Sequence, residues 1–80
     1  MQTSFTNNGT AYTATVRHSD DTRIIEVRRA GSAAVLHSDH TKHDVIFDAQ
    51  NSNVDLSVQA ATDTLIDDFK RLVSEGLLNG

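Results

Sequence analysis

The feature that most constrains the fold of this chain is a pair of alternating segments, residues 12–18 and 23–29, which a short polar turn separates. Apolar and polar side chains alternate in both segments, and a period of two is typical of a β-strand with one buried face. Pairing His18 with Arg23 brings the apolar side chains of both segments onto the same face, as cross-strand packing requires. The two segments therefore predict an antiparallel hairpin.

Further strands are predicted on either side of this hairpin. Residues 7–9, Asn-Asn-Gly, tolerate the positive φ of a tight turn, so a first hairpin is expected there. Residues 32–37 and 44–48 are interpreted as two more strands, and strict alternation over 54–59 predicts another. The apolar face of the sheet is then expected to consist of Tyr12, Ala14, Val16, Ile25, Val27, Ala34, Leu36, Val45 and Phe47.

The spacing of the apolar residues changes to a helical period in the C-terminal part of the chain. A buried helical stripe is predicted to consist of Leu65, Ile66, Phe69, Leu72 and Val73. Thr62 or Thr64 can cap the first turn, and Gly76 can adopt the left-handed conformation that often ends a helix. The sequence thus predicts one amphipathic helix over about 62–75.

Together these elements predict an α+β domain, in which an antiparallel sheet of about five to six short strands packs in two layers against one C-terminal amphipathic helix, 62–75. Eighty residues suffice for one hydrophobic core but not for two, so a single domain over 1–80 is expected. No apolar run approaches the roughly 18 residues that span a bilayer, and the polar start lacks the pattern of a secretory signal. We expect no membrane partner and a cytoplasmic location.

The distribution of charge disfavours nucleic acid as a partner. The chain has a formal net charge of −4, and all of the acidic excess lies after residue 31. Binding to a phosphate backbone needs several clustered Lys or Arg side chains, and the four aromatic residues leave few platforms for stacking bases. We therefore expect no nucleic-acid partner.

Three histidines, His37, His40 and His43, recur at intervals of three residues in a segment interpreted as a polar loop. Neutral imidazole is the commonest metal ligand in proteins, so a transition-metal site in this loop is the alternative hypothesis for the function. A loop that senses pH is a further alternative, since three imidazoles would become charged together. We expect these side chains to be solvated, because this spacing fixes no convergent geometry on a loop, and we assign no metal site and no cofactor.

Residues for catalysis are not indicated by the sequence. The chain has no cysteine, no G-x-S-x-G elbow and no glycine-rich phosphate loop. The adjacent carboxylates at 20–21 and 67–68 lie in a predicted turn and on a predicted helix flank, where solvation is the ordinary explanation. The sequence therefore predicts a protein that is not an enzyme.

The best candidate for a functional surface is the sheet face opposite the helix. Ile24, Val35 and Ile46 are expected to form a small apolar patch there, and Arg17 and Arg28 share the same face. A contiguous exposed apolar patch usually marks a partner surface, and edge strands without proline can pair with another chain. We therefore predict a module that binds another protein, or a second copy of itself as a homodimer, through these five residues or through an edge strand.

Overall fold

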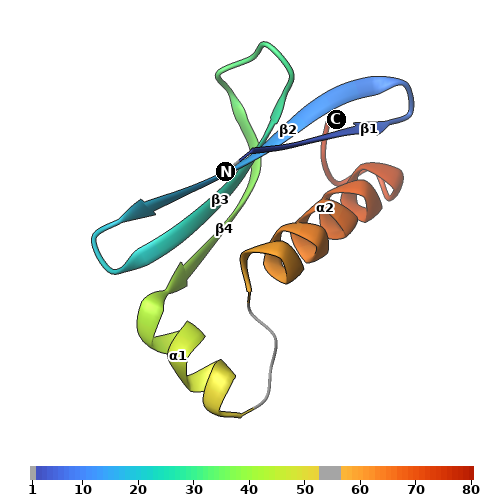
Figure 1. Ribbon diagram of the computed structural model, residues 1–80. Coiled ribbons are helices and arrows are strands. Elements are labelled where there is room, and N and C mark those ends of the chain that lie inside the picture. Colours follow the sequence, from blue (N-terminus) through green and yellow to red (C-terminus); the bar gives the residue numbers. More distant parts are fainter. Residues whose placement is uncertain (1, 53–56) are drawn as a thin grey trace.

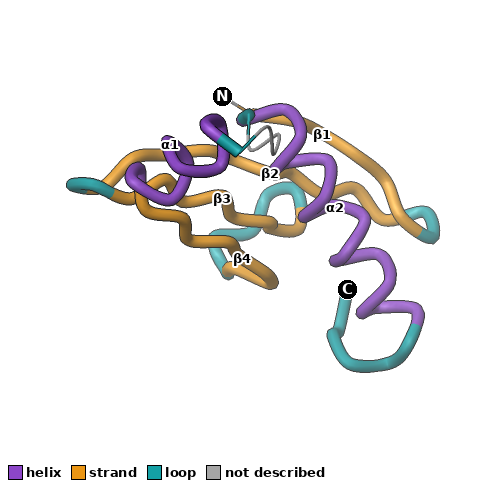
Figure 2. Tube along the Cα trace, turned by 90° about the horizontal axis from the view of Figure 1, so that it is seen from below, coloured by secondary structure: helices purple, strands orange, loops and turns teal. Residues whose placement is uncertain are grey.

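The computed structural model describes residues 2–52 and 57–80 and shows an α+β fold, with four antiparallel strands in one open sheet and two helices (Figure 1). The elements in chain order are β1 (Gln2–Asn7), β2 (Thr10–Ser19), β3 (Thr22–Arg29), β4 (Val35–Lys42), α1 (His43–Asn51) and α2 (Val58–Ser74). Both helices lie below the sheet in Figure 1, and they pass in front of the strands when the molecule is seen from below (Figure 2). Neither helix, within the described residues, is long and apolar enough to cross a membrane.

Both predicted hairpins are confirmed. The β1–β2 turn consists of Asn8 and Gly9, which have φ of 53° and 79°, and such positive values are what this turn requires. In the second hairpin His18 pairs with Arg23, so that the apolar side chains of β2 and β3 share one face. Asp20 also has a positive φ of 53°, which is consistent with the two-residue turn between these strands.

The fourth strand is longer and later in the sequence than predicted. The segment 32–37 was expected to be a strand followed by a polar loop, but β4 begins at Val35 and continues to Lys42 along β3. Its polar composition is compatible with a strand at the edge of the sheet, where backbone hydrogen bonds to β3 hold it and few side chains need to be buried. Leu36 is the extra residue of a bulge opposite Val27 and Arg28.

The predicted strand at 44–48 is wrong, because these residues form part of α1. Three consecutive apolar residues fit a strand or a helix equally well, so the sequence pattern could not decide between them. Val45 and Phe47, which were expected in the apolar face, are exposed in the helix, and Ala34 is exposed in the connection before β4. The described sheet consequently has four strands instead of five to six.

The C-terminal helix begins one turn earlier than predicted. The Ser57 side chain accepts a hydrogen bond from the Ala60 backbone N–H, so Ser57 is the N-cap in place of Thr62 or Thr64. Val58 and Gln59, which were assigned to a strand over 54–59, therefore belong to α2, and the part of that assignment at 54–56 lies outside the described residues.

The end of α2 follows the prediction closely. Gly76 has a φ of 76°, its N–H donates to the Val73 carbonyl, and the Leu77 N–H donates to the Leu72 carbonyl. These two bonds define a Schellman motif, which satisfies carbonyl groups that the helix leaves open. Leu77 itself is exposed, whereas Leu78 packs against the core.

The core lies between α2 and the face of the sheet that the alternating pattern predicted. Phe69 on α2 is fully buried and meets the Tyr12 ring edge-on, with 5.0 Å between ring centroids, and the Phe5 ring at 6.0 Å. Phe5 and Tyr12 stack on each other at 5.3 Å, which joins β1 to β2. The other buried members of this cluster are Ala14, Ile25, Val27, Leu65 and Ile66.

Replacing Phe69 by Ala should lower the free energy of unfolding by about 3–5 kcal/mol, because it removes a buried ring and leaves a cavity between α2 and the sheet. Phe47→Ala is the matched control, since the Phe47 side chain is 63% exposed and its loss should change stability by no more than about 0.5 kcal/mol. Urea unfolding followed by circular dichroism measures both changes. Equal losses in the two variants would contradict this account of the core.

Candidate functional site

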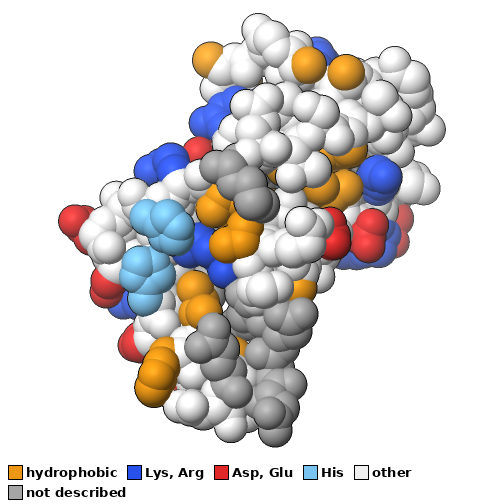
Figure 3. Space-filling view, in the orientation of Figure 1, with side chains coloured by type: hydrophobic (Ala, Val, Ile, Leu, Met, Phe, Trp, Pro, Cys, Tyr) orange, Lys and Arg blue, Asp and Glu red, His pale blue; other side chains and the backbone are white. Residues whose placement is uncertain are grey.

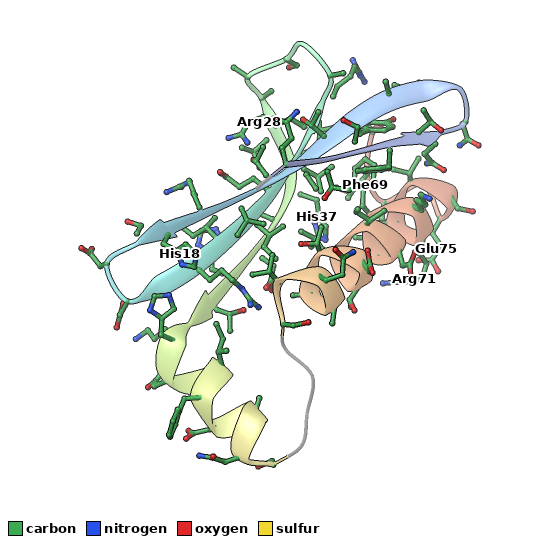
Figure 4. The ribbon with its side chains drawn as sticks, viewed as in Figure 1. His18, Arg28, His37, Phe69, Arg71 and Glu75 are labelled. Carbon is green, nitrogen blue, oxygen red and sulfur yellow. The ribbon has the colours of Figure 1, made fainter. Side chains whose placement is uncertain are left out.

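The side of the sheet away from the helices carries an ion-pair network at its centre. Glu26 on β3 lies between Arg17 on β2 and Arg28 on the same strand. The Arg17 Nε donates to Glu26 Oε1 at 3.0 Å, and an Arg28 terminal nitrogen lies 3.3 Å from the same oxygen. Arg28 is seen on the side of the sheet away from α2 in Figure 4. Strand alternation thus brings together the two arginines that were predicted to share this face.

The two arginines control the ionisation of Glu26. The hydrogen bond from Arg17 is the largest cause, and together with the bond and charge of Arg28 it lowers the pKa of the Glu26 carboxyl below its ordinary value of 4.5. Burial of the carboxyl acts in the opposite direction but is outweighed. Glu26 is therefore held as a carboxylate, and the centre of this face is a fixed arrangement of charges.

This outer face is basic although the chain is acidic. By strand alternation the charged side chains that face outward from β2, β3 and β4 are Arg17, Glu26, Arg28 and Lys42, three cations against one carboxylate. The whole chain has a formal net charge of −4, so its acidic excess lies elsewhere. Basic charge on an otherwise acidic molecule creates a local potential that attracts anionic groups.

The predicted apolar patch on this face is not formed. Ile24 is on the outer face, but it is only 5% exposed, between its cross-strand neighbours Arg17 and His40. Val35, at the start of β4 and opposite Arg28, is 44% exposed and remains as an isolated apolar side chain. Ile46 lies on α1 and not on a strand, because the apolar run that contains it is helical. The three residues therefore do not make one contiguous surface.

An edge of the sheet borders the basic face. The order β1-β2-β3-β4 leaves β4 paired only with β3 within the described chain. β4 is eight residues long and contains no proline, and its only irregularity is the bulge at its beginning. Backbone groups on the outer side of such a strand can form a ladder with another extended segment.

The three histidines of the alternative hypothesis are directed to three different places. His37 faces α2, where its Nε2 lies 2.9 Å from Asp68 Oδ2, and strand alternation turns His40 to the outer face. His43 begins α1, and its imidazole meets that of His18. No group of three or more His, Cys, Asp or Glu side chains is placed to hold a metal within residues 2–52 and 57–80.

The sequence pattern did not reveal a cleft between the first half of α2 and the inner face of β3 and β4. The cleft encloses about 420 Å³, and its polar lining includes Arg23, His37, Asp39, Thr64 and Asp68. Its residues come from three separate segments, so only their tertiary arrangement makes it visible.

Asp68 lines this cleft and also pairs with Arg71 on the exposed surface of α2. Hydrogen bonds from Arg71, the larger cause, and from His37 lower the pKa of the Asp68 carboxyl. Arg71 also pairs with Glu75 one turn further along the helix, and Figure 4 shows His37 directed between the sheet and α2. The Asp68 carboxylate thus has a contact on each of its oxygen atoms, which explains its position without a bound ligand.

The chain matches no protein-family model, curated protein or solved structure with which it was compared. A function for this chain is therefore inferred from the geometry of its own residues.

Glu26 should make stability depend on pH in acid. Its pKa is lower in the folded than in the unfolded chain, so the unfolded chain binds more protons and acidification favours unfolding. The contribution is complete above the unfolded value of 4.5 and is lost as the pH falls through the folded value. Glu26→Gln should cost about 1 kcal/mol or less at pH 7, since Arg17 is largely exposed, and the difference from the parent should shrink below about pH 4.5. Urea unfolding at several pH values measures this difference, and one that grows on acidification would contradict the assignment.

Proposed function

We propose that this chain is a non-enzymatic protein-interaction module, which binds an extended acidic segment of another protein along β4 and the adjoining outer face of the sheet. The observation that carries the proposal is a basic sheet face next to edge strand β4, whose outer side pairs with no other strand among the described residues, in an acidic chain. The proposal retains two expectations from the sequence, namely action in the cytoplasm and the absence of a cofactor.

Strand addition supplies the affinity in this proposal. An extended segment that lies beside β4 would form backbone hydrogen bonds with the outer edge of this strand. Alternate side chains of that segment would face outward on the same side as Arg28, and exposed Val35 offers an apolar contact at one end. Backbone pairing therefore accounts for binding, and the charges of the face account for the choice of an acidic partner.

The two arginines have different roles in the proposal. Arg28 uses its Nε for the Ala33 carbonyl and its terminal nitrogens for the Thr15 hydroxyl and for Glu26, so its hydrogen-bonding groups serve the sheet itself. Arg17 is 54% exposed and bonds to Glu26 through Nε, which leaves its terminal nitrogens without a partner among the described residues. These nitrogens can donate to a carboxylate that lies over the outer face. Because β3 separates Arg17 from the edge strand, Arg17 is the stronger candidate for recognising the part of the partner that extends across this face, not the part paired with β4.

Arg17→Gln should weaken binding of a ten-residue peptide in which glutamate and threonine alternate. The expected loss is about two- to fivefold in affinity, the size of one exposed ion pair. Arg71→Gln is the matched control, because Arg71 is 56% exposed and also pairs with carboxylates, but it lies on α2. NMR titration of the ¹⁵N-labelled chain at low salt gives the affinities and locates the peptide, whose contacts should shift the amide signals of β4.

Other outcomes of the same titration would overturn the proposal. Shifts confined to α2, or an equal loss in the Arg71 variant, would place the peptide elsewhere. A DNA duplex that shifts the same amides and binds more tightly than the peptide would assign the face to a phosphate backbone instead. A diffusion coefficient that corresponds to a dimer before peptide is added would indicate that a second copy of the chain binds at the edge of β4 instead.

A further inference from the structure

A pair of imidazoles at the surface is independent of the proposed interaction face. His18 lies near the end of β2 and His43 is the first residue of α1, 25 positions later in the sequence. His18 Nδ1 and His43 Nε2 are 3.2 Å apart, the ring centroids are 5.3 Å apart and the rings are inclined at 51°. Both side chains are exposed, and Figure 3 shows pale blue imidazoles gathered on one part of the surface. His18 is labelled beside the β2–β3 hairpin in Figure 4.

The backbone holds the two rings in this relation. His18 is in a strand and pairs with Arg23 across the hairpin. The His43 backbone N–H donates to the Asp21 carbonyl at 2.8 Å, so the first residue of α1 is tied to the turn that follows β2. Ligands on defined elements are positioned more precisely than ligands on a loop. This pair therefore has the fixed geometry that the sequence could not supply for His37, His40 and His43.

The separation of the two nitrogens suits a shared metal ion. With metal–nitrogen bonds of about 2.0–2.1 Å, nitrogens 3.2 Å apart subtend an angle of about 100–106° at the metal, near the tetrahedral value. We propose that His18 Nδ1 and His43 Nε2 form a two-ligand site for a divalent transition-metal ion, of which Zn²⁺, Ni²⁺ and Cu²⁺ are the ions that imidazole prefers.

The chemistry of binding balances without loss of a proton from the neutral pair. In the metal-free pair one facing nitrogen carries a proton and donates a hydrogen bond to the lone pair of the other. In the metal-bound pair both facing nitrogens donate a lone pair to the ion. The ring that carried the facing proton holds it on its other nitrogen instead, His18 Nε2 or His43 Nδ1. The metal thus replaces a hydrogen bond by two coordinate bonds.

The rest of the coordination shell comes from water. No third imidazole or carboxylate joins the pair within the described residues, so the site differs from the closed four-ligand sites that hold structural zinc. The charged residues nearest in the chain to these two histidines are Arg17, Asp20, Asp21, Arg23, Lys42 and Asp44, three carboxylates and three cations. These charges balance, so the two imidazoles must supply the binding energy, and a two-ligand shell implies modest affinity and rapid exchange of the metal.

A metal bound to both histidines would hold the start of α1 against the β2–β3 hairpin. Val45 and Phe47 are exposed on this helix, so little of its apolar surface contributes to the core. A metal that bridges α1 and β2 adds a tie at the start of the helix, close to the backbone bond between His43 and Asp21. The ion would therefore stabilise the position of α1 rather than the sheet, because the buried cluster lies between the sheet and α2.

The test is a titration of the full 80-residue chain with Zn²⁺ alone, followed through the imidazole signals in NMR spectra and by calorimetry. The parent should show saturable binding with selective changes at His18 and His43. His18→Ala and His43→Ala should each lower the affinity about tenfold or more, since either change leaves one ligand and abolishes chelation. His40→Ala is the matched control, because His40 is also an exposed imidazole but lies on the outer face of β4. The Zn²⁺ affinity of this variant should equal that of the parent.

A second variant separates loss of a ligand from loss of the helix. His43→Gln keeps an exposed polar side chain at the start of α1, and it should lose Zn²⁺ binding while its circular dichroism spectrum stays that of the parent. The proposal is overturned if the parent does not bind, if both alanine variants bind as the parent does, or if the His40 variant loses as much affinity. None of these results involves the acidic peptide, so failure of the metal proposal would not count against the proposed interaction module.

Discussion

The contact of Phe69 with the stacked Phe5 and Tyr12 rings is the interaction on which the rest of the structure depends. It joins three elements, since Phe5 is on β1, Tyr12 on β2 and Phe69 on α2. Edge-on aromatic pairs add attraction to the burial of area alone. In a chain of 80 residues without cysteine, no disulfide can replace this contact. The position of α2, and with it the inner side of the sheet, follows from this cluster.

The inner strand β3 separates the apolar and the charged sides of the sheet. Ile25 and Val27 face the core and are fully buried, whereas Glu26 between them faces outward to the two arginines. The alternation of side chains along one strand thus provides packing on one face and a charged network on the other. Because the network lies on the two inner strands of the described sheet, its charges are held in place by the same backbone ladder that supports the core.

The two proposed sites depend on different features of the fold. The interaction face depends on what the sheet leaves open, namely an edge strand and a basic surface in an acidic chain. The imidazole pair depends on a junction, where the end of β4 places α1 against the turn of the β2–β3 hairpin. Either site can be altered by exposed substitutions, because neither contains a residue of the aromatic cluster. Binding at either site can therefore be tested with variants that do not alter the aromatic cluster.

The sequence by itself determined the local features that have a short-range cause: both hairpins, the register of the second one, the apolar stripe of α2 and the glycine end of that helix. It also placed Arg17 and Arg28 on one face, since alternation along a strand follows from covalent geometry. Only the tertiary structure decided that residues 37–42 pair with β3 and that 45–47 are helical, because backbone pairing and available space outweigh composition at an edge. For the same reason it alone brought His18 and His43 together, since no local pattern specifies which of two distant side chains will meet.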